Sequence, residues 1–469
     1  MSASQSLYQQ TTLPVLLITA AISYALLLGV SWYVNAAWLP LALILVVPVI
    51  YFGIKAVNKP YLWLFLIIAG SYAGNALHLF EGFTVPVSLF QLFFLSGLFL
   101  LFLNRIYTGQ FTFRISGLEL EFALFSALMF LSIIYSPEPD DALLFAVRTV
   151  VTALLLYFVL NVVEDKKELP VILAFTATLG LVMAIFSVRD GLMNPEAAIM
   201  SAISGGAKLF SRASTTQTDP NVFATYFFLP IAFCSCIILS KVKNSYRILA
   251  AVFLSVLIAG LLSTFSRSSW VSAILMLVLI ALIYRQVKLF VWLGVAGILA
   301  LILLPDLRIT AMNIIQRFTD IFAGASDDSS RIRVVQLYAA IHMFVDSNML
   351  GVGLRGYAES ILTYHTYQDL IGIVLPHNVP YTILAELGLA GIMLFLFIIY
   401  RLTRDSFMNI RYADDELSRV VAVSLFVSLM AFFLFFQFIG GGLPDNNVWL
   451  IIGLVYATKH TLLSPSADA

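Results

Sequence analysis

Long apolar stretches recur along this 469-residue chain, separated mostly by short loops that hold glycine, proline, asparagine or charged residues. Many of them approach or exceed the roughly 20 residues that a helix needs to cross a bilayer. The pattern predicts fourteen spans and two long gaps, 187–219 and 306–376. The predicted spans are residues 13–31, 36–54, 61–79, 86–103, 118–135, 142–161, 170–186, 220–240, 247–265, 269–284, 289–305, 377–400, 418–438 and 446–462.

The composition supports this pattern, because 61% of the residues are hydrophobic and only 11% are charged. A soluble domain carries about 25% charged residues. The sequence therefore predicts an all-α polytopic membrane protein with about 12–14 transmembrane helices. The expected parts are N-terminal helices (1–186), an external loop (187–219), a helical core (220–305), a large external loop (306–376), C-terminal helices (377–462) and a cytoplasmic tail (463–469).

The distribution of basic residues predicts the orientation. With the N-terminus in the cytoplasm, sixteen of the 26 Lys and Arg residues fall on the cytoplasmic side. Among the short external loops, only one holds a basic residue, Arg267. This asymmetry follows the positive-inside rule and places both termini in the cytoplasm and both long loops outside it. The other nine basic residues lie in the long loops or, for Arg148, in a span. Long external loops tolerate such charge, so these nine residues either have a functional role or are simply tolerated where they lie.

The large external loop contains a predicted amphipathic helix at residues 329–347. Its apolar face would hold Ile332, Val335, Tyr338, Ala339, His342 and Val345 at helical spacing. Ser329 or Ser330 is suited to cap its start. Arg331 would then lie in the first turn, where free backbone N–H groups favour anions.

Two arginines are candidate phosphate ligands. Arg267 lies in a tight turn, TFSRSSW, where a guanidinium can bind a phosphate through two hydrogen bonds. The alternative is an arginine that reaches the membrane surface and only fixes the turn. Arg331 has its own alternative, a solvated side chain or an ion pair with Asp327 or Asp328.

Three further residues are candidates for proton transfer or a polar cavity. His377 follows a proline and opens a predicted span, and histidine readily accepts a proton near neutral pH. It would otherwise be a capping or interfacial residue. Arg148 and Glu386 fall inside predicted spans, where charges are costly and are usually paired. They would form an ion pair or line a polar cavity open to the external face.

No metal or cofactor site is expected. The acidic pairs Asp327/Asp328 and Asp414/Asp415 lack the ligand spacing of known metal sites. Cys234 and Cys236 lie two residues apart on one predicted helix and do not face each other. The formal net charge of zero gives no indication of partners, and nothing predicts a nucleic-acid partner.

Several segments, in order, resemble the bacterial O-antigen ligases and the O-antigen and exopolysaccharide polymerases. Over roughly 218–396 these segments are TDPNVFATYF, TFSRSSW, DDSSRIRVVQLYAAIHMFVDSNMLGVGLRGY and a final motif. The final motif is His377-Asn378, nine residues, and then Gly388-Leu389-Ala390-Gly391. Each piece is weak alone, but together they are fairly specific.

The resemblance implies a helical fold of the GT-C-like, lipid-carrier glycosyltransferase type in the bacterial inner membrane. It implies transfer of a glycan from undecaprenyl diphosphate, at the outer face of that membrane, to lipid A core or to a second lipid-linked repeat. Arg267 and Arg331 would bind the diphosphate, and His377 would be the general base of an inverting, metal-independent reaction. Arg355 and Arg212 are secondary candidates for binding glycan or phosphate. Candidate protein partners are a chain-length regulator and a flippase.

The alternatives come from other functional classes. Some relatives have been labelled anion carriers, so an anion or solute transporter is one of them. A transporter is expected to show internal repeats and broken helices at the bilayer midplane. A non-catalytic scaffold for envelope assembly is the other alternative. Fourteen spans favour a polymerase over a ligase, for which about twelve is typical of the family.

Overall fold

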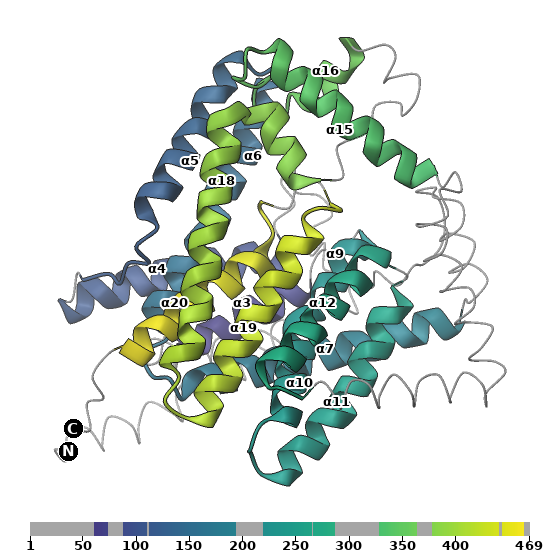
Figure 1. Cartoon of the computed structure of the whole chain (residues 1–469). Helices are drawn as coiled ribbons and strands as arrows, with labels where there is room; N and C mark the ends of the chain where they lie inside the picture. Colours follow the sequence, from purple (N-terminus) through teal and green to yellow (C-terminus); the bar gives the residue numbers. More distant parts are fainter. Residues whose placement is uncertain are drawn as a thin grey trace, which may run out of the picture.

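The computed structural model describes residues 61–73, 88–109, 112–193, 219–264, 266–286, 328–363, 378–439 and 443–463. Within these ranges every regular element is a helix, and most of the helices form one bundle (Figure 1). The all-α prediction is therefore confirmed. The elements are α3 (Tyr61–Ala73), α4 (Leu89–Thr108), α5 (Glu119–Ser132), η1 (Ile133–Tyr135), α6 (Pro139–Val162), α7 (Glu168–Met193), α9 (Pro220–Thr225), α10 (Phe228–Leu239), α11 (Asn244–Ser263), α12 (Arg267–Ile283), α15 (Asp328–Asp346), α16 (Tyr357–Ser360), η2 (Ile361–Thr363), α18 (Val379–Tyr412), α19 (Glu416–Phe435) and α20 (Asn446–Leu463).

In the described part of the chain, seven helical segments are long and apolar enough to cross a membrane. They are α4, α6, α7, α9 with α10, α11, α18 and α19, and shorter apolar helices include α3 and α12. These helices confirm a polytopic membrane protein. The predicted spans 13–31, 36–54 and 289–305 lie outside the described residues, so the total of fourteen stays a prediction.

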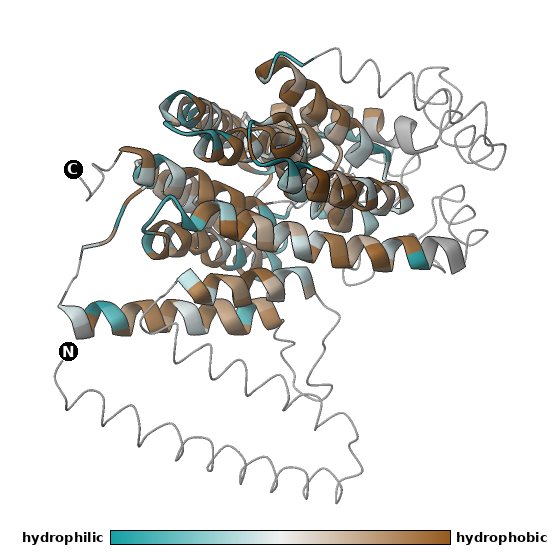
Figure 2. Cartoon of the chain, turned by 90° about the horizontal axis from the view of Figure 1, so that it is seen from below, coloured by the Kyte–Doolittle hydropathy of each residue, from teal (hydrophilic) through white to brown (hydrophobic). Residues whose placement is uncertain are grey.

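The bundle has inner and outer helices. The segment of α9 and α10 is 83% buried inside the protein, whereas α11 is only 22% buried. Large apolar side chains, among them Leu95 and Phe99 of α4 and Val252 of α11, remain exposed. Figure 2 shows hydrophobic residues over most of the helical ribbon, and the exposed ones give the bundle an apolar outer surface. Such surfaces are suited to lipid, because lipid tails solvate apolar side chains that water would not.

Glycine allows close packing between helices at two contacts. A Cβ atom on Gly453 of α20 would lie 2.8 Å from the Cβ of Val159 on α6. One on Gly260 of α11 would lie 2.6 Å from the Cβ of Ala184 on α7. Small residues at such crossings let backbones approach, which favours association of helices in lipid.

Two helices extend beyond their predicted ends. Helix α7 continues to Met193, although the external loop was expected from residue 187. Ser187 is buried and donates to the carbonyl of Gly260, so the helix stays packed there. Helix α18 continues to Tyr412 rather than ending near residue 400, because its first polar residues are paired. Arg401 binds Glu121 at 2.8 Å.

A buried carboxylate joins α18 to α20 near the same end. Asp405 of α18 accepts from Lys459 of α20 at 2.9 Å and from Arg404 at 3.0 Å. The hydroxyl of Tyr456 donates to the same carboxylate at 3.3 Å. A buried charge is tolerated when it is paired and hydrogen-bonded in this way. These bonds hold the polar last turns of α18 against α20.

Candidate functional site

Helix α18 is broken at Gly388, so the predicted span 377–400 is not one straight helix. Gly388 has φ 64° and ψ −155°, a conformation open almost only to glycine. The break divides α18 into a short arm, Val379–Leu387, and a long arm, Leu389–Tyr412. Figure 1 shows a sharp bend near the upper end of α18.

The short arm folds back along the long arm. In a straight helix Ile383 and Gly391 would be roughly 12 Å apart along the axis. A Cβ atom on Gly391 would instead lie 3.4 Å from Cγ2 of Ile383. The two glycines of the Gly-x-x-Gly motif thus have separate roles: Gly388 makes the turn and Gly391 leaves room for the returning arm.

The turn at residues 349–353 replaces helical hydrogen bonds that the break removes. The N–H groups of Val352 and Gly353 donate to the carbonyls of Ala385 and Glu386 at 2.8 and 3.1 Å. The N–H of Leu389 donates to the carbonyl of Met349 at 2.9 Å. The glycine-rich segment and the Gly-x-x-Gly motif, separate in the sequence, therefore form one structural unit.

Glu386 lies inside this unit. Its side chain is only 4% exposed. The N–H of Tyr357 donates to its Oε1 atom at 3.4 Å, and the backbone N–H of Arg355 also bonds to its carboxylate. The buried carboxylate is thus held by backbone amides of the segment that leads into α16.

Arg355 forms an ion pair with α6, and Arg148 is exposed on the same helix. The guanidinium of Arg355 binds Asp141 at 2.6 Å and lies over the ring of Phe145, so it links the unit to α6. Arg148 is exposed on α6, and no ion pair joins it to Glu386 among the described residues. The ion pair between Arg148 and Glu386, one of the two alternatives for these residues, is therefore wrong, since backbone amides hold Glu386.

The N-terminus of the short arm is fixed to the end of α19. Asn378 caps the arm by accepting from the N–H of Tyr381 at 2.9 Å. Its amide nitrogen donates to the carbonyl of Gln437 at 3.0 Å, and the N–H of Val379 donates to that of Phe436 at 2.9 Å. His377 precedes Asn378 directly but lies outside the described residues, as does Arg212.

A second pair of motif segments meets at the start of α12. Arg267 is the first residue of α12 and is partly buried. The hydroxyl of Ser266 donates to the side-chain oxygen of Asn221 at 2.8 Å and also contacts Ser269 at 2.9 Å. Asp219 caps α9 by accepting from the N–H of Asn221. The segments TDPNVFATYF and TFSRSSW thus form a second contact pair.

Helix α15 confirms the predicted helix in the large loop, but its buried face differs from the prediction. Ala339, Ala340 and Met343 are fully buried in a cluster with Tyr357 and Ala385. The predicted face members Tyr338, His342 and Val345 are exposed. Ser329 and Ser330 lie within the first turn rather than before it, since the helix begins at Asp328. The reason for the shifted face is that small residues let α15 lie close to the short arm. Arg331 is in the first turn, but its side chain is not among those that the structure describes.

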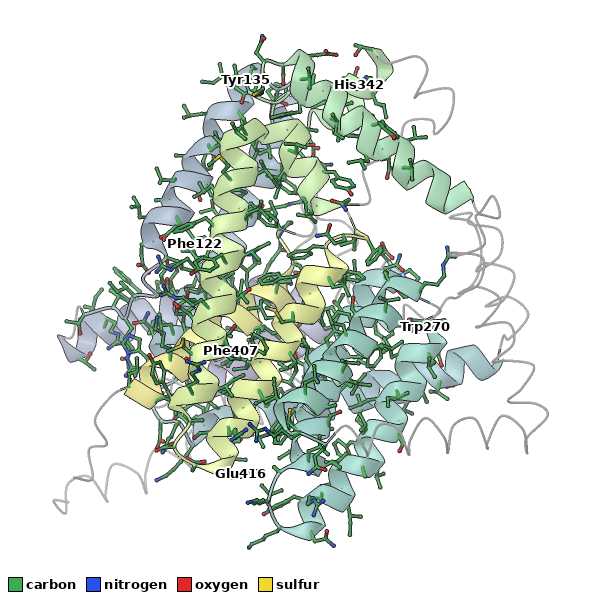
Figure 3. All side chains as sticks on the ribbon, in the orientation of Figure 1. Phe122, Tyr135, Trp270, His342, Phe407 and Glu416 are labelled. Atoms are coloured by element: carbon green, nitrogen blue, oxygen red, sulfur yellow. The ribbon has the colours of Figure 1, made fainter. Side chains whose placement is uncertain are left out.

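Helix α19 connects the two contact pairs. Its C-terminal residues bind Asn378 and Val379, and its side packs against α12 and α10. Figure 3 places His342 of α15 and Tyr135 at one end of the molecule and Glu416, which starts α19, at the opposite end. The large-loop helix and the cytoplasmic loop predicted from charge therefore lie at opposite ends.

Three contacts that build the site are not predicted by the sequence pattern: Asn221 with Ser266, Arg355 with Asp141, and Glu386 with backbone amides. In the described ranges no group of three or more His, Cys, Asp or Glu side chains is arranged to hold a metal ion.

Residues 250–396 match the family model described as Wzy_C: O-Antigen ligase. That segment contains the positions of Arg267, Arg331 and His377. No curated protein matches the chain. The resemblance to the O-antigen ligase and polymerase superfamily is therefore confirmed for this segment: residues 250–396 of this multi-pass membrane protein match the O-antigen ligase family model.

Proposed function

We propose that this protein is a membrane glycosyltransferase of surface polysaccharide assembly. It moves a glycan from undecaprenyl diphosphate to an acceptor hydroxyl at the outer face of the bacterial inner membrane, as a polymerase or a ligase. The observation that carries the proposal is the family match over 250–396, which covers all three predicted reactive positions. Both termini would then lie in the cytoplasm, as the basic loops predict.

The proposed reaction is a single displacement at the anomeric carbon. The acceptor oxygen forms the new glycosidic bond while the bond to the phosphate oxygen breaks, which inverts the anomeric configuration. His377 takes the hydroxyl proton. Arg267 and Arg331 bind the diphosphate and stabilise the negative charge that develops on the leaving group. In this scheme the cationic groups need no metal ion or cofactor.

The arrangement of the motif segments supports this scheme. Arg267 starts a helix whose N-terminus is fixed through Ser266 to Asn221. Asn378, next to His377, is fixed to the end of α19, which also packs against α12. A rigid connection between a phosphate-binding residue and a base is what positioning of two substrates requires.

The broken helix does not favour the transporter alternative. In transporters, unwound carbonyls at the bilayer midplane remain available to coordinate ions or solutes. Here the carbonyls of Ala385 and Glu386 accept from Val352 and Gly353. The break is therefore closed by the protein itself. The GT-C-like classification and the protein partners remain expectations from the resemblance.

The lipid species in cells that lack the protein test the proposal. Polymer still attached to its lipid carrier would identify a ligase, and single lipid-linked repeats would identify a polymerase. The purified protein, with a lipid-diphosphate-linked glycan, should complete the same step in vitro. Normal surface polysaccharide and no accumulated lipid-linked glycan in those cells would contradict the proposal.

A further inference from the structure

The short arm of α18 is held at two places. At its N-terminus, Asn378 and Val379 bond to Gln437 and Phe436. At its C-terminus, the carbonyls of Ala385 and Glu386 bond to the turn. Between these points the arm has only two helical turns, so a small rotation at one end displaces the other.

The Glu386 carboxylate makes the side-chain contact at the C-terminal attachment of the short arm. It is buried, and an unbonded carboxylate in such a place would carry a large desolvation cost. Its bonds to the N–H groups of Arg355 and Tyr357 satisfy it. The same bonds fix the course of the chain from the turn into α16. Glu386 therefore ties the segment 355–357 to the short arm.

The ion pair beside it does not duplicate this role. The Arg355 guanidinium reaches away to Asp141 and Phe145 of α6. It attaches the turn to the wall of the bundle, whereas Glu386 attaches the turn to the short arm. Arg355 itself has φ 62°, a strained value for a residue with a side chain, and so needs both attachments.

We propose that Glu386 is a positioning residue: through the turn at residues 349–357 it sets the orientation of the short arm, and thereby the position of His377 relative to the acceptor hydroxyl. This inference rests on the proposed function. Arg267, one of the two proposed phosphate ligands, belongs to the other contact pair, so its part in donor binding is independent of Glu386.

Kinetics of Glu386→Ala in the purified full-length protein separate positioning from folding. The expected loss in kcat is about 100-fold, as misplacement of a reacting group by about 1 Å produces. The KM for a lipid-diphosphate-linked glycan should change much less than kcat, because the part of donor binding that Arg267 provides is unaffected. Glu386→Gln, which keeps an acceptor oxygen, should retain more activity than Glu386→Ala. The matched control is Glu359→Ala, an exposed acid in the neighbouring α16.

A cross-link tests whether attachment of the turn to the short arm is what Glu386 supplies. The N–H of Val352 donates to the carbonyl of Ala385 at 2.8 Å, and both residues belong to one apolar cluster. These neighbouring positions are therefore the pair to replace by cysteines, and a disulfide forms where their Cα atoms are about 4.4–6.8 Å apart. In the Glu386→Ala background, oxidation should restore transfer and reduction should abolish it. Cys234 and Cys236 are buried and remote in sequence from this pair.

The possible outcomes are distinct. If the wild-type protein transfers no glycan, the proposed function fails, whatever the variants do. If the wild-type protein is active and Glu386→Ala matches it, the positioning role is wrong. The positioning role is also wrong if the loss of kcat in Glu386→Ala is fully explained by a smaller folded fraction, measured by thermal unfolding. It is wrong as well if the oxidised cross-link restores no glycan transfer.

Discussion

The hydroxyl of Ser266 donates to the side-chain oxygen of Asn221 at 2.8 Å, across 45 residues of sequence. This bond joins the helix that begins with Arg267 to the start of α9. Ser266→Ala should leave the Asn221 oxygen without this donor and should lower stability by about 0.5–1.5 kcal/mol. Thermal unfolding measures this loss. An unchanged melting temperature would mean that the contact does not stabilise the protein.

Arg267→Ala should abolish glycan transfer while the protein still inserts and folds. Removal of one charge-stabilising group typically lowers kcat by about 100- to 1,000-fold. Arg331→Ala should act in the same way. Arg189→Ala is a suitable control, because Arg189 is exposed near the end of α7 and has no proposed role. Normal surface polysaccharide in both Arg267→Ala and Arg331→Ala would refute the phosphate-binding role.

His377→Ala distinguishes the two candidate activities. A ligase should lose transfer strongly, since the general base contributes about 100- to 10,000-fold to the rate. Transfer near the wild-type level would argue for a polymerase or against a base role for His377. The measurement is single-turnover transfer with saturating donor, so that donor binding does not mask the chemical step.

Gly388→Ala should be far more damaging than Gly109→Ala. Both glycines have similar positive φ values, 64° and 68°. A Cβ on Gly388 would lie 2.1 Å from the carbonyl oxygen of Met349, whereas one on Gly109 would meet nothing within 4 Å. Gly109→Ala should therefore lower the free energy of unfolding only by the strain of a positive φ, about 1–2 kcal/mol. Equal losses of thermal stability would show that the Gly388 contact is not tight.

The loop between α18 and α19 should weaken in acid. Partial burial alone would raise the pKa of the Asp415 carboxyl, but bonds from Ser418 and Lys166 outweigh it and lower the pKa to about 2. The unfolded value is about 3.9, so this contribution is complete above that pH and is lost as the pH falls toward 2. The difference in melting temperature between the wild-type protein and Asp415→Asn should shrink over that range. A difference that stays constant with pH would contradict this assignment.

The sequence predicted the described helices well, because long apolar stretches have few other stable forms in a membrane. It did not predict helix ends such as Tyr412, since Arg401 continues the helix through a partner, Glu121, that is distant in sequence. The break at Gly388 was also missed. A glycine within an apolar stretch does not by itself predict a break, because a helix tolerates it. The break is stable only because the turn at 349–353 bonds to it.

The candidate site was predictable in its residue types but not in its connections. Motif order selected Arg267, Arg331 and His377, whose roles stay predictions. The spacing in α15 favoured Tyr338, Ala339 and Val345 as buried residues, yet of these only Ala339 is buried, together with Ala340. Hydrophobicity cannot reveal that a close approach to the short arm requires small side chains.

The hydrogen bond between Val379 and Phe436 has a consequence for how this protein can diversify. It fixes Asn378 to the helical bundle rather than to the external loops. Under the proposed function, insertions, deletions and charge changes in those loops, outside the turn at residues 349–357, would alter which glycans are admitted without disturbing the end of the short arm. Variation in acceptor choice and constancy of the reactive geometry would then belong to different parts of the chain.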